Sequence, residues 1–201
     1  MELFGGMCAG LEACLRNGWK VRRYMYVDIN AQVRKVAAFR VAALMAQYPE
    51  QLPAGACQEA FSLWPQDVYS LQLQHLQQLQ RMGGPVLVWA GWECQDLSPA
   101  GSGRGLQGRH SSTFFPLLRI LEQLQGLLGP SLGWVLENTA IDVPWQRDQG
   151  VLQDLQHIKG VLGEPLQLDA AQFGSRAHRL RYYWTNLASH QQLQFVLQHI
   201  S

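Results

Sequence analysis

The chain has 201 residues, 47% of them hydrophobic, and a mean hydropathy of -0.12. This length can bury the core of one globular domain, and no apolar run approaches the roughly 18 residues that span a membrane. With 16 basic and 15 acidic residues, the chain lacks the basic excess typical of a stand-alone DNA-binding protein. Composition therefore argues against a membrane protein and against a purely electrostatic nucleic-acid binder.

The cysteines and the first residues bear on the cellular setting. Cys8, Cys14, Cys57 and Cys94 contain neither a CxxC pair nor a zinc-like spacing with histidine, so no metal site is predicted. No basic segment precedes Glu2, which disfavours a secretory signal. We therefore expect a reducing, intracellular setting.

The first 28 residues are typical of half a cofactor site. Residues 2–11 predict a strand end, a turn containing Gly5 and Gly6, and a helix that starts near Gly10 and stops at Gly18. A strand over residues 24–27 follows and ends at Asp28, at about the spacing that places a carboxylate on a cofactor ribose. The combination indicates a cofactor that contains a nucleoside.

Helical and strand patterns alternate along the rest of the chain. Asn30 is predicted to cap a helix over residues 31–47, whose inward side chains are Val33, Val36, Ala37, Val41 and Leu44. Further helices are expected over residues 70–81, after Ser111, Ser112 or Thr113, over 151–158 and over 193–200. Strands are expected near 61–64 and over 86–89, 132–136, 166–168 and 181–184. This alternation predicts an α/β fold with a mostly parallel sheet and helices on both faces.

Polar side chains with catalytic potential follow the later strands. Cys94 lies just past the 86–89 strand, where an α/β sheet gathers its chemistry, although a buried thiol is the simpler interpretation of a single cysteine. Glu137 closes the 132–136 strand and could share a pocket with Cys94, or it could cap a helix or face solvent. Arg179 and Arg181 lie along the last strand, and we expect only one to face the pocket while the other fixes a loop or a phosphate.

Five ordered motifs resemble the cytosine-C5 DNA methyltransferase family, in particular its de novo and plant domains-rearranged branch. They are Phe4-Gly5-Gly6-Met7-Cys8-Ala9-Gly10-Leu11, Asp67-Val68, Gly91-Trp92-Glu93-Cys94-Gln95-Asp96-Leu97-Ser98, Leu136-Glu137-Asn138-Thr139, and Ala177-His178-Arg179-Leu180-Arg181-Tyr182-Tyr183-Trp184-Thr185-Asn186. Together they span almost the whole chain. The resemblance implies a Rossmann-like, S-adenosylmethionine-dependent methyltransferase fold.

The resemblance also implies roles for individual residues. Cys94 would attack C6 of a flipped cytosine in DNA, Glu137 would bind N3 and the amino group, and Arg179 or Arg181 would hold the base oxygen. S-adenosylmethionine would then methylate C5. Its binding residues would be Phe4, Gly6, Met7, Gly10, Asp28, Ile29, Asp67 and Val68, with Phe4 near the adenine and Asp28 on the ribose.

Two departures from the family pattern are visible. The family has proline before the catalytic cysteine, whereas this chain has Glu93, whose carboxylate would raise the pKa of the thiol. The family also continues into a target-recognition region and a final cofactor motif, whereas here the resemblance stops soon after Asn186. We therefore expect a truncated catalytic domain over residues 1–187 and a helical tail over 188–201, in a fragment or a degenerate homologue.

Three functions are compatible with these residues. The first is a DNA cytosine-5 methyltransferase, which implies DNA as the partner and the nucleus as the location. The second is a catalytically impaired regulatory homologue that pairs with an active methyltransferase subunit. Glu93 and the absent target-recognition region support this second function. The third is methylation of another nucleic acid such as RNA, against which the Ala-His-Arg-Leu-Arg pattern at 177–181 argues.

Overall fold

The computed structural model describes residues 1–97, 104–141 and 149–200, with side-chain detail up to Leu197. It divides into two compact units. Unit 1 comprises Met1–Gly91 and Pro116–Leu132, and unit 2 comprises Trp92–Phe115 and Gly133–Ser201. Ser98 of the cysteine motif lies outside the described residues, as does Ser201 at the end of the predicted tail. Among the helices in the described ranges, none is long and apolar enough to cross a membrane.

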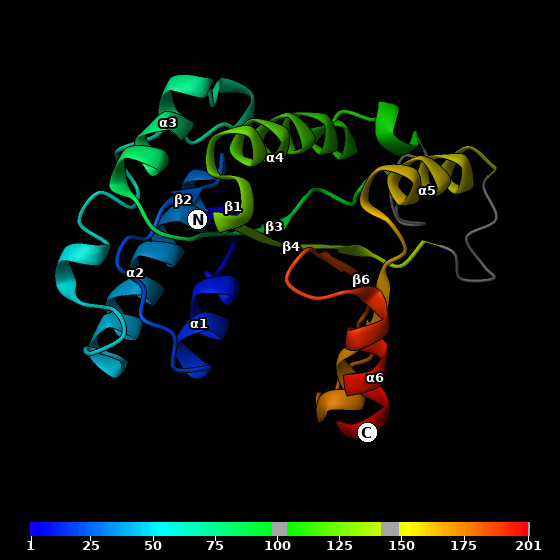
Figure 1. The fold of residues 1–201 in the computed structure, drawn as a ribbon. Coiled ribbons are helices and arrows are strands. Elements are labelled where there is room, and N and C mark those ends of the chain that lie inside the picture. Colours follow the sequence, from blue (N-terminus) through cyan, green and yellow to red (C-terminus); the bar gives the residue numbers. More distant parts are fainter. Residues whose placement is uncertain (98–103, 142–148, 201) are drawn as a thin grey trace. The chain divides into compact units, whose positions relative to one another are not determined.

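Unit 1 is built on three parallel strands in the order β2-β1-β3. Its elements are β1 (Glu2–Leu3), α1 (Ala9–Arg16), β2 (Tyr26–Val27), α2 (Ala31–Gln47), α3 (Leu73–Met82), β3 (Val86–Gly91) and most of α4 (Phe114–Leu128). Leu3 is paired with Val27 on one side and with Ala90 on the other. Helices α1 and α2 lie on one face of these strands, and α3 and α4 lie on the other (Figure 1).

The helix after β2 begins where the sequence predicts. The Asn30 side chain accepts hydrogen bonds from the backbone N–H groups of Gln32 and Val33, which caps α2 at Ala31. Ala37, Val41 and Leu44 are buried as predicted. The prediction that Val36 faces inward is wrong. Helix α2 has apolar side chains around much of its circumference, and its buried residues are Ala37, Val41 and Leu44, so Val36 lies beside the buried stripe rather than in it.

The strand predicted near residues 61–64 is absent from the structure, which has turns and bends there. Pro65 supplies no N–H group for a strand ladder. Asp67 then accepts a hydrogen bond from the Tyr69 N–H and caps a short 3₁₀ helix, Val68–Ser70. In this segment the Asp67 cap therefore favours a 3₁₀ helix, and the apolar pattern does not form the predicted strand.

Unit 2 carries the remaining strands in the order β4-β6-β5. Its elements are β4 (Leu132–Thr139), α5 (Gln149–Leu162), β5 (Leu166–Asp169), the 3₁₀ helix η6 (Ala170–Phe173), β6 (Leu180–Thr185) and α6 (His190–Ile200). Strand β6 runs antiparallel to both neighbours, so β4 and β5 run in the same direction. The predicted α/β class is confirmed, with β6 as the reversed strand.

Aromatic rings form the core of unit 2. The ring centroid of Trp92 lies 5.3 Å from that of Phe114 and 5.5 Å from that of Trp184. Tyr182 packs edge-on against Trp184 at 5.8 Å. These contacts join Trp92, just after β3, to the start of α4 and to β6, and they fix the chain just before Cys94.

Candidate functional site

The turn between β1 and α1 has a backbone that few side chains tolerate. Phe4, Gly6 and Cys8 all have positive φ angles, at 53°, 50° and 59°. A Cβ atom added to Gly5 would lie 2.4 Å from the Tyr26 ring, and one added to Gly10 would lie 2.4 Å from the Trp89 ring. The glycines therefore allow close packing between the turn and the strands beneath it.

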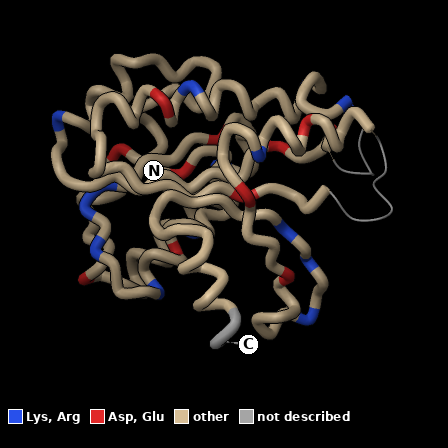
Figure 2. The backbone as a smooth tube through the Cα atoms, turned by 45° about the vertical axis from the view of Figure 1, so that its right-hand side comes forward, with Lys and Arg blue, Asp and Glu red and all other residues tan. Residues whose placement is uncertain are grey.

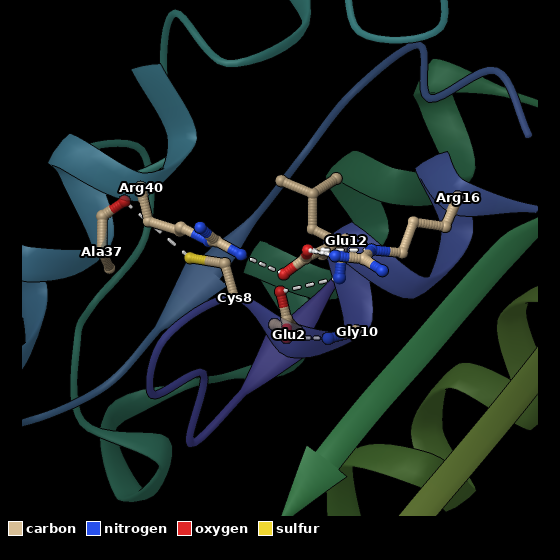
Figure 3. Close-up of polar contacts among 8 residues, drawn as sticks. Glu2, Cys8, Gly10, Glu12, Arg16, Ala37 and Arg40 are labelled. Carbon is tan, nitrogen blue, oxygen red and sulfur yellow. Dashed lines mark hydrogen bonds and ion pairs between the residues drawn. The ribbon is translucent and has the colours of Figure 1, made fainter. Parts of the chain in front are cut away.

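A buried carboxylate lies directly below this turn. Glu2 accepts hydrogen bonds from the backbone N–H of Gly10 at 2.8 Å and of Leu11 at 3.3 Å, and a further one from the Tyr24 hydroxyl. Figure 3 shows the Glu2 side chain directed at Gly10. Burial raises the pKa of Glu2, and the hydrogen bonds from Tyr24 and from the two backbone N–H groups oppose that rise. Sequence reasoning assigned Glu2 no role, although an acid just before a glycine turn is a usable signal.

The Glu2 contact tests which cofactor fits the turn. In dinucleotide sites, the first N–H groups of the helix bind a pyrophosphate. Here two of those N–H groups already have a carboxylate partner, and a bound phosphate would meet the negative charge of that carboxylate when it is ionised. A nucleoside cofactor that carries a sulfonium cation in place of phosphates fits this arrangement. The residues present therefore suit S-adenosylmethionine better than a dinucleotide.

Asp28 and two apolar side chains complete this part of the turn. Asp28 lies just after β2, and its carboxylate accepts hydrogen bonds from Gly6 N–H at 3.1 Å and from Asn30 N–H at 2.9 Å. Each carboxylate oxygen can accept one more hydrogen bond, as a ribose hydroxyl would require. Met7 and Ile29 are exposed beside these polar groups. The predicted cofactor residues of the first 29 positions are thus brought together, with Phe4 half-buried at the start of the turn.

Asp67 and Val68 are placed less directly. The carboxylate of Asp67 binds the Tyr69 N–H within its own turn. Val68 is buried, and its carbonyl accepts a hydrogen bond from Arg119 at 3.2 Å. None of the contacts given for these two residues reaches the glycine turn, so their role toward the adenine stays a prediction.

The three cysteines of unit 1 are poor nucleophiles. Burial raises the pKa of Cys8 to about 12 and that of Cys57 to about 11. Burial also raises the pKa of Cys14. Cys8 is fully buried, 3.9 Å from the Ala37 carbonyl oxygen, beside the ion pairs that Glu12 makes with Arg16 and Arg40 (Figure 3). These thiols therefore belong to the packing of unit 1 rather than to its chemistry.

Cys94 lies in unit 2, three residues past the end of β3, and is half-buried. Burial raises the pKa of its thiol, and Arg181 opposes this rise. The carboxylates of Glu137 and Glu93 both raise the pKa further, with Glu93 the weakest cause of all. Arg181 is therefore the side chain that most favours the thiolate, the reactive form of a cysteine, at this position.

Glu137 and the two arginines form one cluster. Oε1 of Glu137 lies 2.9 Å from Nε of Arg181 and 3.9 Å from Nη2 of Arg179. The prediction that only one arginine faces the site is wrong, because both guanidinium groups lie beside Glu137, Arg181 from β6 and Arg179 from the loop just before it. Glu137 itself lies within β4, opposite Tyr183 of β6, rather than beyond the strand end. The structure therefore brings all four predicted catalytic residues into unit 2, and the charges of Glu137 and Arg181 both act on Cys94.

Two residues that sequence reasoning assigned no role hold this cluster in place. Asn138 donates a hydrogen bond from Nδ2 to the Trp92 carbonyl at 3.0 Å, which ties β4 to the chain before Cys94. The buried carboxylate of Asp96 accepts hydrogen bonds from His110 N–H at 2.8 Å and from Ser111 N–H at 3.0 Å. Both residues lie within motifs that the sequence already singled out, next to Glu137 and close to Cys94, and that position was the available signal.

Glu93, which stands where the family has proline, is partly exposed. Its carboxylate accepts a hydrogen bond of 3.4 Å from Gln95, an exposed side chain. Its effect on the Cys94 pKa has the predicted direction but is weaker than those of Arg181 and Glu137.

Within the described ranges, no group of three His, Cys, Asp or Glu side chains is arranged to hold a metal ion.

Comparisons with known proteins bear on the fold. No protein-family model matches the chain, and no curated protein matches it. Among solved structures, Dnmt2 methyltransferase from S. pombe is similar with a TM-score of 0.55 and 15% identity, over 92% of this chain and 49% of that one. A triple mutant of DNMT2 from Spodoptera frugiperda gives a TM-score of 0.49 and 18% identity, over 94% and 50% of the two chains. This chain thus spans about half the length of both proteins. The S. pombe likeness confirms the predicted Rossmann-like α/β fold over 92% of this chain.

Proposed function

We propose that the chain is an S-adenosylmethionine-dependent methyltransferase that methylates C5 of cytosine in DNA through a covalent cysteine adduct. The observation that carries this proposal is the cluster in unit 2. It combines a half-buried thiol, a carboxylate and a guanidinium group 2.9 Å from that carboxylate. Attack on a pyrimidine ring requires this set of groups, because the ring is a poor electrophile until its N3 side is stabilised.

In the first step, the Sγ thiolate of Cys94 bonds to C6 and the electron pair of the C5–C6 bond moves into the ring. Glu137 accepts a hydrogen bond from the exocyclic amino group and, when protonated, donates one to N3, so it stabilises the charge that develops there. Arg181 orients Glu137 and favours the thiolate. S-adenosylmethionine, when bound, would supply an electrophilic methyl group for C5 and would leave as S-adenosylhomocysteine. Loss of the C5 proton to water then returns the electron pair of that C–H bond, which re-forms the C5–C6 double bond and expels the Cys94 thiolate.

The residues of unit 1 would hold the cofactor. Asp28 would accept the ribose hydroxyls, Met7 and Ile29 would cover apolar parts of the nucleoside, and Phe4, Gly6 and Gly10 would shape the turn around it. Asp67 and Val68 would contact the adenine edge. The support for this assignment is the Glu2 carboxylate at the start of α1, which disfavours a phosphate-bearing alternative.

A second candidate function is a regulatory homologue that binds a related, active methyltransferase subunit. The observation that favours it is the position of Glu93, whose charge raises the pKa of Cys94 and lowers the thiolate fraction. A nuclear location, which the resemblance to the de novo branch implies, is part of the same proposal.

Transfer of a tritiated methyl group from S-adenosylmethionine to a DNA duplex tests the proposal, with an RNA duplex of the same sequence as the competing substrate. We expect label in 5-methylcytosine of the DNA, and loss of the label in Cys94→Ser but not in the matched variant Cys57→Ser. Label on RNA alone would contradict the DNA assignment. Cofactor binding without transfer, in a chain that Glu93→Pro activates, would favour the regulatory homologue.

A further inference from the structure

A basic loop in unit 2 is unusually exposed. Residues 172–179, which run from the second half of η6 to the start of β6, are all exposed to solvent. Phe173 is 55% exposed, and the side chains of His178 and Arg179 are 88% and 63% exposed. An aromatic ring and cationic side chains on one exposed loop are a combination that protein packing does not explain.

The loop carries positive charge without a compensating acid of its own. Residues 170–182 contain Arg176, Arg179 and Arg181 and no Asp or Glu. Figure 2 shows Lys and Arg positions in succession along this stretch of the chain. In a chain with 16 basic and 15 acidic residues, this is a local excess rather than a general one.

The nearest acid in sequence, Asp169, serves to hold the loop. Its carboxylate accepts hydrogen bonds from Ala171 N–H at 3.0 Å and Arg179 N–H at 2.8 Å, and it pairs with His178 Nδ1 at 3.0 Å. These contacts, led by the Ala171 N–H, lower the pKa of Asp169 to about 2. Its side chain is only 19% exposed, so the surface of the loop presents mainly cations.

The backbone of the loop is also fixed internally. Ser175 N–H donates to the Ala170 carbonyl at 3.1 Å, and Ala170 N–H donates to the Arg179 carbonyl at 3.2 Å. The loop ends at Arg179, whose guanidinium lies 3.9 Å from Glu137. The backbone of the loop is therefore fixed, and one of its cations, Arg179, lies next to the carboxylate that would bind the target base. A fixed backbone lowers the entropy lost on binding.

We propose that residues 172–179 bind the sugar-phosphate backbone of DNA next to the target base, an inference that rests on the proposed function for its ligand. Arg176 pairs with a phosphate, and Phe173 packs against a sugar or an unstacked base. The binding is independent of sequence, because phosphates carry no sequence information. It gives a chain of near-neutral net charge a local contact to a polyanion.

The test uses fluorescence anisotropy of a duplex that contains only A·T pairs, titrated with the chain at several salt concentrations. Arg176→Gln is compared with Arg81→Gln, which removes the same charge from an exposed position at the end of α3. We expect Arg176→Gln to weaken binding and to reduce the slope of log K against log salt by about 0.9, the value for one phosphate contact. The rise in Kd between 50 and 200 mM salt then shrinks about threefold, whereas Arg81→Gln leaves the slope unchanged.

An unchanged slope in Arg176→Gln would overturn the proposal, as would a native chain that does not bind the duplex. Equal binding to phosphatidylserine vesicles would overturn the assignment to DNA. The A·T duplex offers no cytosine, so this result does not depend on the methylation chemistry. A chain that forms a covalent adduct with cytosine but has an unchanged slope would keep its proposed function and lose this loop contact. A chain that forms no adduct with cytosine, but whose slope is reduced in Arg176→Gln, would keep the loop contact and lose its proposed function.

Discussion

Two glutamates on strands illustrate how the two units differ. Glu2 on β1 is buried, and its partners are two backbone N–H groups and the Tyr24 hydroxyl. Glu137 on β4 is 29% exposed in its side chain, and its partners are the guanidinium groups of Arg179 and Arg181. The first carboxylate organises a backbone turn and has no free surface for a substrate. The second is accessible and flanked by cations, which is the environment of a group that binds or reacts.

The same glutamate side chain therefore has a different role depending on which groups donate hydrogen bonds to its carboxylate. Neutral backbone donors fix the geometry of a helix start, so removing Glu2 should affect folding and cofactor binding. Cationic donors around a partly exposed carboxylate leave it able to contact a ligand, so removing Glu137 should affect chemistry. Substitutions in the two units should therefore separate effects on stability from effects on chemistry.

The largest expected effect follows from Glu137→Gln. The variant loses the carboxylate that would stabilise charge on the pyrimidine, so the rate of adduct formation should fall roughly 10²- to 10³-fold. Its unfolding free energy should change little, since the side chain is partly exposed. Stopped reactions on a 5-fluorocytosine duplex measure the rate, with Glu122→Gln on the exposed face of α4 as the control. A rate within threefold of the native value would remove Glu137 from the mechanism.

Gly10→Ala should damage unit 1 through packing. The added Cβ would lie 2.4 Å from the Trp89 ring, and we expect a loss of about 1–3 kcal/mol in unfolding free energy. Gly126→Ala in α4 is the matched variant, because nothing lies within 4 Å of its added Cβ. It should stabilise the chain by about 0.5–1 kcal/mol through helix propensity. Chemical denaturation measures both, and equal effects would contradict the close contact in the structure.

Glu2→Gln should change how stability depends on pH. Burial raises the pKa of Glu2 in the folded chain above its ordinary value of 4.5, so its folded form binds the proton more tightly than the unfolded form. This contribution to stability is full below pH 4.5 and is lost as the pH rises through the folded-state pKa. Relative to the native chain, Glu2→Gln should therefore gain stability with rising pH. Denaturation curves from pH 4 to 8 that stay parallel for the two chains would contradict the burial of this carboxylate.

The smallest effect concerns Glu93. Its carboxylate is the weakest of the causes that raise the pKa of Cys94, so Glu93→Gln should move the pH profile of adduct formation slightly toward lower pH. Arg181→Gln should move the profile toward higher pH, since Arg181 lowers that pKa. Rates measured between pH 6 and 9 give both midpoints. Shifts of the opposite sign would mean that the reactive group is not the Cys94 thiol.

Local signals in the sequence predicted the elements well. Asn30 and the apolar spacing after it placed α2, and the motifs around Cys94, Glu137 and Arg181 selected residues that the fold brings into one unit. These features depend on side chains close together in sequence. Such local features can therefore be predicted from the sequence without a structure.

The strand expected near residues 61–64 failed for a local reason, the Asp67 cap, whereas other features that the sequence did not reveal depend on distant contacts. The buried stripe of α2 depends on the elements it packs against, which the helix alone does not reveal, so Val36 was assigned to the wrong face. The direction of β6 leaves no mark in its alternating side chains, because a strand reads the same in either orientation. The role of Glu2 depends on a helix start eight residues later and on Tyr24 from β2.

Covalent trapping tests the central claim most directly. The native chain and Cys94→Ser are each incubated with S-adenosylmethionine and a duplex that carries 5-fluorocytosine, whose C5 fluorine cannot leave as a proton does. We expect a denaturation-resistant complex of protein and DNA for the native chain alone. No complex in a native chain that binds S-adenosylmethionine, or an equal complex with Cys94→Ser, would contradict it.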